Sequence, residues 1–265
     1  GDIVFLDTVD GTTEGTEDLT LTANSGSVAF HATVGEDIAL GAILITTAVD
    51  VEAFDAITAA SFVQSAGDGT TTLHADVTTI ASEGIDLTTG RVVLDWIHLT
   101  AGGDGGVRFD APVELAGPVE IDAGGAIRFE NTVVSPGGEA ASLILNTPDD
   151  VVFLDAVGSG ADNALGAITI LHADFVDADS TITAASLVQC AGTGTTTLRG
   201  DVTTSAAEGV DLTTSEIVLE EISILAAGGG IVRFDGPVDL AGSVEIDAEG
   251  TITFESTLTS SGDPQ

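Results

Sequence analysis

One stretch of this sequence occurs twice. ITAASFVQSAGDGTTTLHADVTT begins at Ile57 and returns as ITAASLVQCAGTGTTTLRGDVTT at Ile182, 125 positions later. The similarity continues without a gap to about Ser135 in the first copy and about Ser260 in the second. It also extends upstream, because GAILITTAVD at position 41 pairs with GAITILHADF at position 166. A duplication of this length is either one repeated domain or a block of several smaller units.

A shorter period lies inside the long one. Phenylalanines preceded by Val or Ile two positions earlier recur at short and nearly regular intervals, as in Phe5 and Phe30 or Phe109 and Phe129. In VRFDAPVELAGPVEIDAGG, from position 107, apolar and polar residues alternate between turns rich in Gly, Pro and Asp. The pattern predicts an all-β chain of stacked parallel coils, a β-solenoid of roughly 20 to 25 residues per coil. A pair of antiparallel β-sandwiches is the competing interpretation.

Repetition of whole coils lengthens a solenoid without requiring a new core. We therefore expect a single β-solenoid over residues 1–265, with two copies of the 125-residue unit at about 41–140 and 166–265. An extra coil is expected near residues 12–34, where the second copy shows no similar sequence. Because the chain begins at Gly1 without Met, we expect it to be a piece of a longer polypeptide.

The net charge of the chain limits the classes of partner that it can bind. Asp and Glu number 43 against 5 Lys and Arg, which gives a formal net charge of −38 and argues against nucleic acid and anionic membranes as partners. High salt or bridging divalent cations make such self-repulsion tolerable, so an extracellular or cell-surface location is expected. The single cysteine, Cys190, allows no internal disulfide, and Ser65 at its counterpart argues against a catalytic thiol. No apolar run reaches the roughly 18 residues of a membrane span.

Two segments carry a resemblance to a known family. EDLTLTANSGSVAFHATV (17–34) and GGAIRFENTVV (124–134) contain alternating apolar residues, a Gly turn and a Val or Ile two positions before Phe. In this pattern the chain resembles the filamentous-haemagglutinin-like and beta strand repeat surface proteins of bacteria. The resemblance implies a right-handed parallel β-helix in a very long secreted or surface-attached polypeptide that acts as an adhesin, fibre or stalk. It assigns no adhesive residue in this chain.

Carboxylates are the most numerous candidate ligands. Asp110 and Glu130 are separated by one local period, as are Asp235 and Glu255, so each pair is expected to stack on adjacent coils. Stacked like charges repel unless a cation intervenes, which suggests that this acidic ladder binds Ca²⁺ with low affinity. The alternative is a solvated acidic face that keeps chains apart, because no known calcium loop motif is present. Arg108 is expected to form surface ion pairs in the same outward row.

Trp96 is the candidate ligand contact. Its counterpart in the second copy is Glu221, a residue type that faces water, so Trp96 is expected to be exposed and able to stack on a sugar or a partner chain. Covering a corner of the coil is an equal alternative. The four histidines do not recur between the copies, and isolated surface positions are expected for His31, His74, His98 and His172.

These observations predict a structural or adhesive segment of a long secreted or surface-attached repeat protein. Its expected partners are neighbouring solenoid segments of the same chain or fibre, and surface glycans. Catalytic and cofactor-binding residues are not expected, since no nucleophile and base recur between the copies. A carbohydrate-binding or carbohydrate-active β-helix, such as a polysaccharide lyase or hydrolase, is the second interpretation. An ice-binding or cation-binding solenoid is the third.

Overall fold

A computed structural model describes residues 1–138 and 140–261. Within these residues the chain forms 31 β-strands and one short 3-10 helix, η1 (Pro136–Gly138). It divides into two compact units, unit 1 (Gly1–Asn131) and unit 2 (Thr132–Gln265). The strands make about 12 turns of a parallel β-solenoid. In the described part of the chain, no helix is long and apolar enough to cross a membrane.

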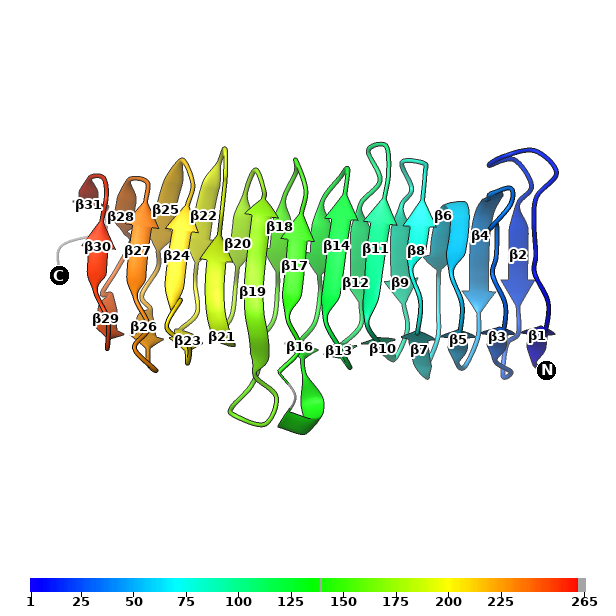
Figure 1. Ribbon diagram of the computed structural model, residues 1–265, viewed down its shortest axis with the longest axis horizontal. Coiled ribbons are helices and arrows are strands. Elements are labelled where there is room, and N and C mark those ends of the chain that lie inside the picture. The colour runs from blue at the N-terminus through cyan, green and yellow to red at the C-terminus, as the bar shows by residue number, and fades with distance from the viewer. Residues whose placement is uncertain (139, 262–265) are drawn as a thin grey trace. The chain divides into compact units, whose positions relative to one another are not determined.

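The strands of unit 1 form three parallel ladders, whose members lie side by side (Figure 1). The first ladder comprises β1 (Ile3–Phe5), β3 (Val28–Phe30), β5 (Val51–Ala53), β7 (Thr70–Leu73), β10 (Arg91–Leu94) and β13 (Val113–Leu115). The second comprises β2 (Leu19–Thr22), β4 (Leu40–Thr47), β6 (Ile57–Gln64), β9 (Ile85–Thr88), β12 (Val107–Asp110) and β15 (Ile127–Phe129). The third runs from the start of β6 through β8 (Val77–Thr79), β11 (Ile97–Ala101) and β14 (Val119–Ala123). All these pairings are parallel, which excludes an antiparallel sandwich for this unit.

Unit 2 repeats the three ladders in the same order. After β16 (Val133–Val134), the first ladder comprises β18 (Val151–Phe153), β20 (Val176–Ala178), β22 (Thr195–Leu198), β25 (Glu216–Leu219), β28 (Val238–Leu240) and β31 (Leu258–Ser260). The second comprises β17 (Leu143–Asn146), β19 (Leu165–His172), β21 (Ile182–Gln189), β24 (Val210–Thr213), β27 (Val232–Asp235) and β30 (Ile252–Phe254). The third runs from the start of β21 through β23 (Val202–Thr204), β26 (Ser223–Ala226) and β29 (Glu245–Ala248). These pairings are parallel as well.

The register of the ladders confirms the predicted coil length. Thr71 pairs with Val51 on the preceding turn and with Val92 on the following turn. The widest spacing in the first ladder of unit 1 separates Ile3 from Val28. The pairs equivalent to those of Thr71 have the same spacings in unit 2. All of these steps lie within the predicted length of roughly 20 to 25 residues per coil. The long duplication is therefore a duplication of whole turns.

Alternation of apolar and polar residues places the core inside the turns. In β12, Val107 and Phe109 are fully buried, whereas Arg108 and Asp110 face outward and are half-buried. Phe109 stacks on the ring of Phe129 one turn later, with 5.2 Å between the ring centroids. Burial of each such ring contributes about 2 to 3 kcal/mol to folding. Stacked apolar ladders of this kind hold each turn to its neighbours.

The segment expected to be an extra coil has a structural counterpart. Residues 12–34 hold β2 and β3, which precede β4 and β5 in their ladders. In unit 2, β17 and β18 precede β19 and β20 in the same way. The turns differ in length, since the step from Val28 to its partner Val51 is shorter than the step from Val151 to its partner Val176. Because of this difference in length, an alignment of the two copies without gaps does not match residues 12–34 with their counterpart in unit 2.

One polar pair recurs inside both units. The buried side-chain oxygen Oε1 of Gln64, at the end of β6, accepts a hydrogen bond from the hydroxyl of Thr71 on β7. Gln189 and Thr196 make the same contact in unit 2. The Nε2 atom of each glutamine has no hydrogen-bond partner among the described residues. The pair links consecutive strands of the second and first ladders across a corner of the turn.

Candidate functional site

A group of charged side chains in unit 1 surrounds Arg108. Its guanidinium lies 3.1 Å from Asp86 on the preceding turn, 3.1 Å from Asp110 on its own strand and 3.2 Å from Glu130 on the following turn. Arg128 adds a second contact to Glu130 at 2.8 Å. Hydrogen bonds from Arg128 and then from Arg108 hold the pKa of Glu130 below its usual value. Two arginines and three carboxylates thus form one ion-pair network across three turns.

Unit 2 contains the same network with one arginine fewer. Arg233 lies 2.9 Å from Asp211, 2.9 Å from Asp235 and 3.3 Å from Glu255. Hydrogen bonds to Asp211 and Asp235 raise the pKa of Arg233 above its usual value. Thr253 stands at the place of Arg128, so Arg233 is the arginine that contacts Glu255 in these ion pairs.

The structure places the predicted acidic ladder inside these two networks. Asp110 and Glu130 directly follow the paired residues Phe109 and Phe129, as their spacing predicts. Asp235 and Glu255 follow Phe234 and Phe254 in the same way. Each of the four carboxylates contacts an arginine. The arginine neutralises part of the negative charge that was expected to attract a Ca²⁺ ion. The outward arginine row has the ion pairs expected of it, and calcium binding by the ladder stays a prediction.

Trp96 lies at a corner between β10 and β11. Its side chain is strongly exposed, at 72%, and its backbone has a left-handed φ of 56°. A Cβ atom at Gly117, one turn later, would collide with Cδ1 and Nε1 of the indole, so the ring lies directly over that glycine. The residue therefore covers a corner with one face of the ring and leaves much of the ring open to solvent.

Three rings stack beside the first ladder of unit 1. Phe54 lies between His31 and His74 on consecutive turns, with ring centroids 4.7 and 5.4 Å apart and nearly parallel planes. His74 also contacts Glu52 at 3.4 Å and Asp95, the neighbour of Trp96, at 3.2 Å. In unit 2 the position of His74 holds Arg199, which pairs with Asp177, Asp179 and Glu220. His31 and His74 are exposed as expected but are not isolated.

The structure also contains a histidine cluster that the sequence pattern did not predict. On the third ladder of unit 1, His98, Glu120 and Asp122 place one ligand atom each within 4.8 Å of one another. The Nε2 atom of His98 lies 2.8 Å from Asp122 and 3.5 Å from the hydroxyl of Thr100. In a catalytic triad, the carboxylate binds one ring nitrogen of the histidine and the nucleophilic hydroxyl binds the other. Here Asp122 and Thr100 both contact Nε2 of His98, so the group is not arranged as a catalytic triad. The separation of His98 and Glu120 by one turn, which pairs them across the ladder, is the signal that would have revealed the cluster.

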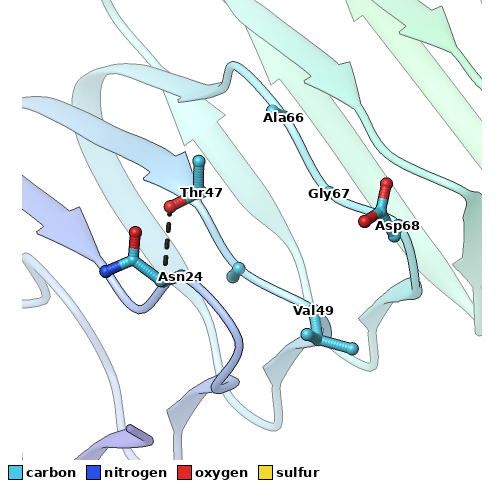
Figure 2. A pocket seen from close by; sticks show the side chains of 7 residues that line it. Asn24, Thr47, Val49, Ala66, Gly67 and Asp68 are labelled. Carbon is cyan, nitrogen blue, oxygen red and sulfur yellow. Dashed lines mark hydrogen bonds between the residues drawn. The ribbon is translucent and has the colours of Figure 1, made fainter.

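Each unit has a surface pocket, and turns of the backbone form most of the lining of the pocket in unit 1. Figure 2 shows the one in unit 1, where the turns after β2, β4 and β6 meet. There the backbone N–H of Asn24 donates a hydrogen bond of 3.3 Å to the hydroxyl of Thr47, and Asp68 is the one ionisable residue of the lining. The pocket of unit 2 is lined mostly by Ala and Thr, between the loop that leads into β19 and the strands β21 and β23. Neither lining brings a nucleophile and a base together.

Comparisons with known proteins give no match: no family model, no curated protein and no solved structure resembles this chain closely enough to be counted as a match. The β-helix repeat architecture therefore rests on the parallel ladders themselves. The bacterial surface-protein family that the sequence resembles stays a proposal.

Proposed function

We propose that this chain is a structural segment of a secreted or surface-attached repeat protein, in which it serves as a shaft, stalk or fibre. The observation that carries the proposal is the repetition of the ladders in both units, with equivalent registers and inward residues that are mainly apolar in both. Turns that differ in their outward residues but share their stacking are suited to supplying length.

The charge of the chain supports the same role. With a net charge of −38, neighbouring chains repel each other, which opposes aggregation through exposed strand edges. The arginine networks tie carboxylates of adjacent turns together within each unit. An extracellular or cell-surface location suits this charge, and neighbouring segments of the same chain or fibre are the proposed partners.

Carbohydrate binding is the second candidate function, because unit 1 displays exposed aromatic residues that unit 2 lacks at the same places. Phe54 is 42% exposed within its stack of histidines, and Trp96 is 72% exposed. Their counterparts in unit 2 are Asp179 and Glu221. Flat exposed rings are what sugar faces stack on, so this edge of unit 1 is where a surface glycan would bind.

A glycan-binding experiment separates the two functions. The intact chain and its Trp96→Glu variant, which carries the residue of the second copy, are tested against an array of surface polysaccharides. Trp96 is the single tryptophan, so its fluorescence reports binding directly. A structural segment shows no saturable binding in either form. Saturable binding that Trp96→Glu abolishes would overturn the purely structural proposal and favour carbohydrate recognition.

A further inference from the structure

The cluster of His98, Glu120 and Asp122 combines an imidazole with two carboxylates on adjacent turns. His98 lies on β11 and the two acids on β14, and the register pairs His98 with Glu120 and Thr100 with Asp122. All three ligand side chains face outward and are half-buried, so they are held by the ladder and still reached by solvent. The backbone N–H of His98 donates a 2.8 Å hydrogen bond to Asp76 on the turn before, which fixes the strand in place.

The donor set selects the kind of cation. Ca²⁺ and Mg²⁺ take oxygen ligands, whereas imidazole nitrogen suits Zn²⁺, Ni²⁺ and related ions. Ligands around a tetrahedral Zn²⁺ are about 2.0 to 2.2 Å from the metal, which sets them about 3.4 Å from one another. The three ligand atoms lie within 4.8 Å of one another, and those of His98 and Asp122 are 2.8 Å apart, so their separations are close to this spacing.

We propose that His98, Glu120 and Asp122 form a binding site for a first-row transition-metal dication of the Zn²⁺ class. Three protein ligands leave a fourth position for water or for a group from another molecule. The strongly negative chain raises the local concentration of cations around it, and the imidazole distinguishes this place from the many carboxylates that attract cations without selecting among them. The site is independent of the acidic ladder at Asp110 and Glu130, which lies on the second ladder of strands.

The duplication supplies an internal comparison. In unit 2 the equivalent places on β26 and β29 hold Ser223, Glu245 and Asp247, with Ser223 paired to Glu245. Both carboxylates recur and the histidine does not. His98→Ser therefore installs the residue that the second copy already carries on an equivalent strand, and it should leave the fold intact.

The test is calorimetric titration of the intact chain with Zn²⁺, in about 0.15 M salt and with Ca²⁺ in large excess to occupy non-selective carboxylates. We expect one Zn²⁺ site per chain, with affinity lowered about tenfold or more by His98→Ser and by Asp122→Asn. The matched control is His74→Arg, which places the residue of the second copy at another histidine that contacts carboxylates. This control should bind Zn²⁺ as the unmodified chain does.

Several results would overturn the proposal: absence of Zn²⁺ binding, displacement of Zn²⁺ by the excess of Ca²⁺, or unchanged binding in His98→Ser. A loss in His74→Arg equal to that in His98→Ser would also do so, because it would assign binding to histidines in general. Circular dichroism of each variant verifies the fold. If Asp122→Asn alone were misfolded, the comparison of His98→Ser with His74→Arg would still decide the matter.

Discussion

Trp96 and Glu221, at equivalent places in the two copies, hold the same left-handed backbone conformation, with φ values of 56° and 52°. Each side chain lies over a glycine on the following turn, Gly117 for Trp96 and Gly242 for Glu221. A large aromatic and a carboxylate thus occupy one structural place in the two copies. The backbone conformation of the corner and the glycine on the next turn are common to both copies, whereas the side chain at this position is an indole in one and a carboxylate in the other.

Substitution of Gly117 by Ala should displace the indole of Trp96. The added Cβ atom would overlap Cδ1 and Nε1 of the ring, and because the ring is exposed it can swing away from the corner at little cost in stability. We expect a red shift of the tryptophan emission with little change in the melting temperature. Gly242→Ala, which meets Glu221 instead, is the control and should leave the emission unchanged. Equal emission shifts in both variants would contradict this account of the corner.

Loss of Arg233 should destabilise the protein more than loss of Arg91. Arg233→Gln removes the cation from three carboxylates, whereas Arg91→Gln breaks a single ion pair of 3.2 Å with Glu114. We expect the free energy of unfolding to fall by about 1 kcal/mol for Arg233→Gln and by a few tenths for Arg91→Gln. The difference should shrink in about 1 M salt, where charges are strongly screened. Urea denaturation measures it, and a difference that does not depend on salt would argue against the network.

The contribution of Glu130 should disappear in acid. The pKa of Glu130 is lowered in the folded protein, chiefly by the hydrogen bond from Arg128. The ionised carboxylate therefore stabilises the fold fully at pH values above the pKa of an unfolded glutamate, which is about 4.3. This stabilisation is lost as the pH falls through the lower, folded pKa. Arg128→Thr, which copies Thr253 of the second unit, should therefore lower stability at neutral pH and have a smaller effect at about pH 3. The same loss of unfolding free energy at both pH values would show that Arg128 acts through packing instead.

The buried pair of Gln64 and Thr71 should be strongly coupled. Thr71→Val leaves the buried Oε1 of Gln64 without its hydrogen bond, at a cost of about 1 to 3 kcal/mol. Adding Gln64→Leu removes the orphaned oxygen together with an Nε2 that has no partner among the described residues. The double variant should thus be more stable than Thr71→Val alone. Simple addition of two separate losses in chemical denaturation would refute the coupling.

Much of the fold could be predicted from the sequence because it depends on a short period. Alternation places Val107 and Phe109 inside and Arg108 outside, and the period stacks Phe109 on Phe129. Such features depend on spacing alone, which the chain repeats often enough to be recognised. The counterpart of residues 12–34 was not recognised, because a turn of unit 1 is shorter there than the corresponding turn of unit 2.

The side-chain clusters were harder to predict because they form across turns of unequal length. His98 lies beside Glu120 only because that turn is longer than the neighbouring step in the second ladder. Arg108 contacts its direct ladder partner Asp86 on one side but reaches Glu130 diagonally on the other. These contacts require the register of each turn and the path of each side chain, which the average period does not provide.

If whole turns are interchangeable units of length, removal of one complete turn should leave the rest of the solenoid intact. Val202 pairs with Ile182 on the preceding turn and with Ile224 on the following turn. Removal of 202–223 therefore places Ile224 beside Ile182, in the position that Val202 held, and each ladder can pair across the deletion. Removal of 202–212 takes out half a turn and leaves the following strands out of register. Circular dichroism with thermal unfolding should show a native β-sheet spectrum and a melting temperature within a few degrees of the parent chain for the whole-turn deletion, and loss of both for the half-turn deletion. Equal damage from the two deletions, or greater damage from the whole-turn deletion, would show that whole turns are not interchangeable units of length.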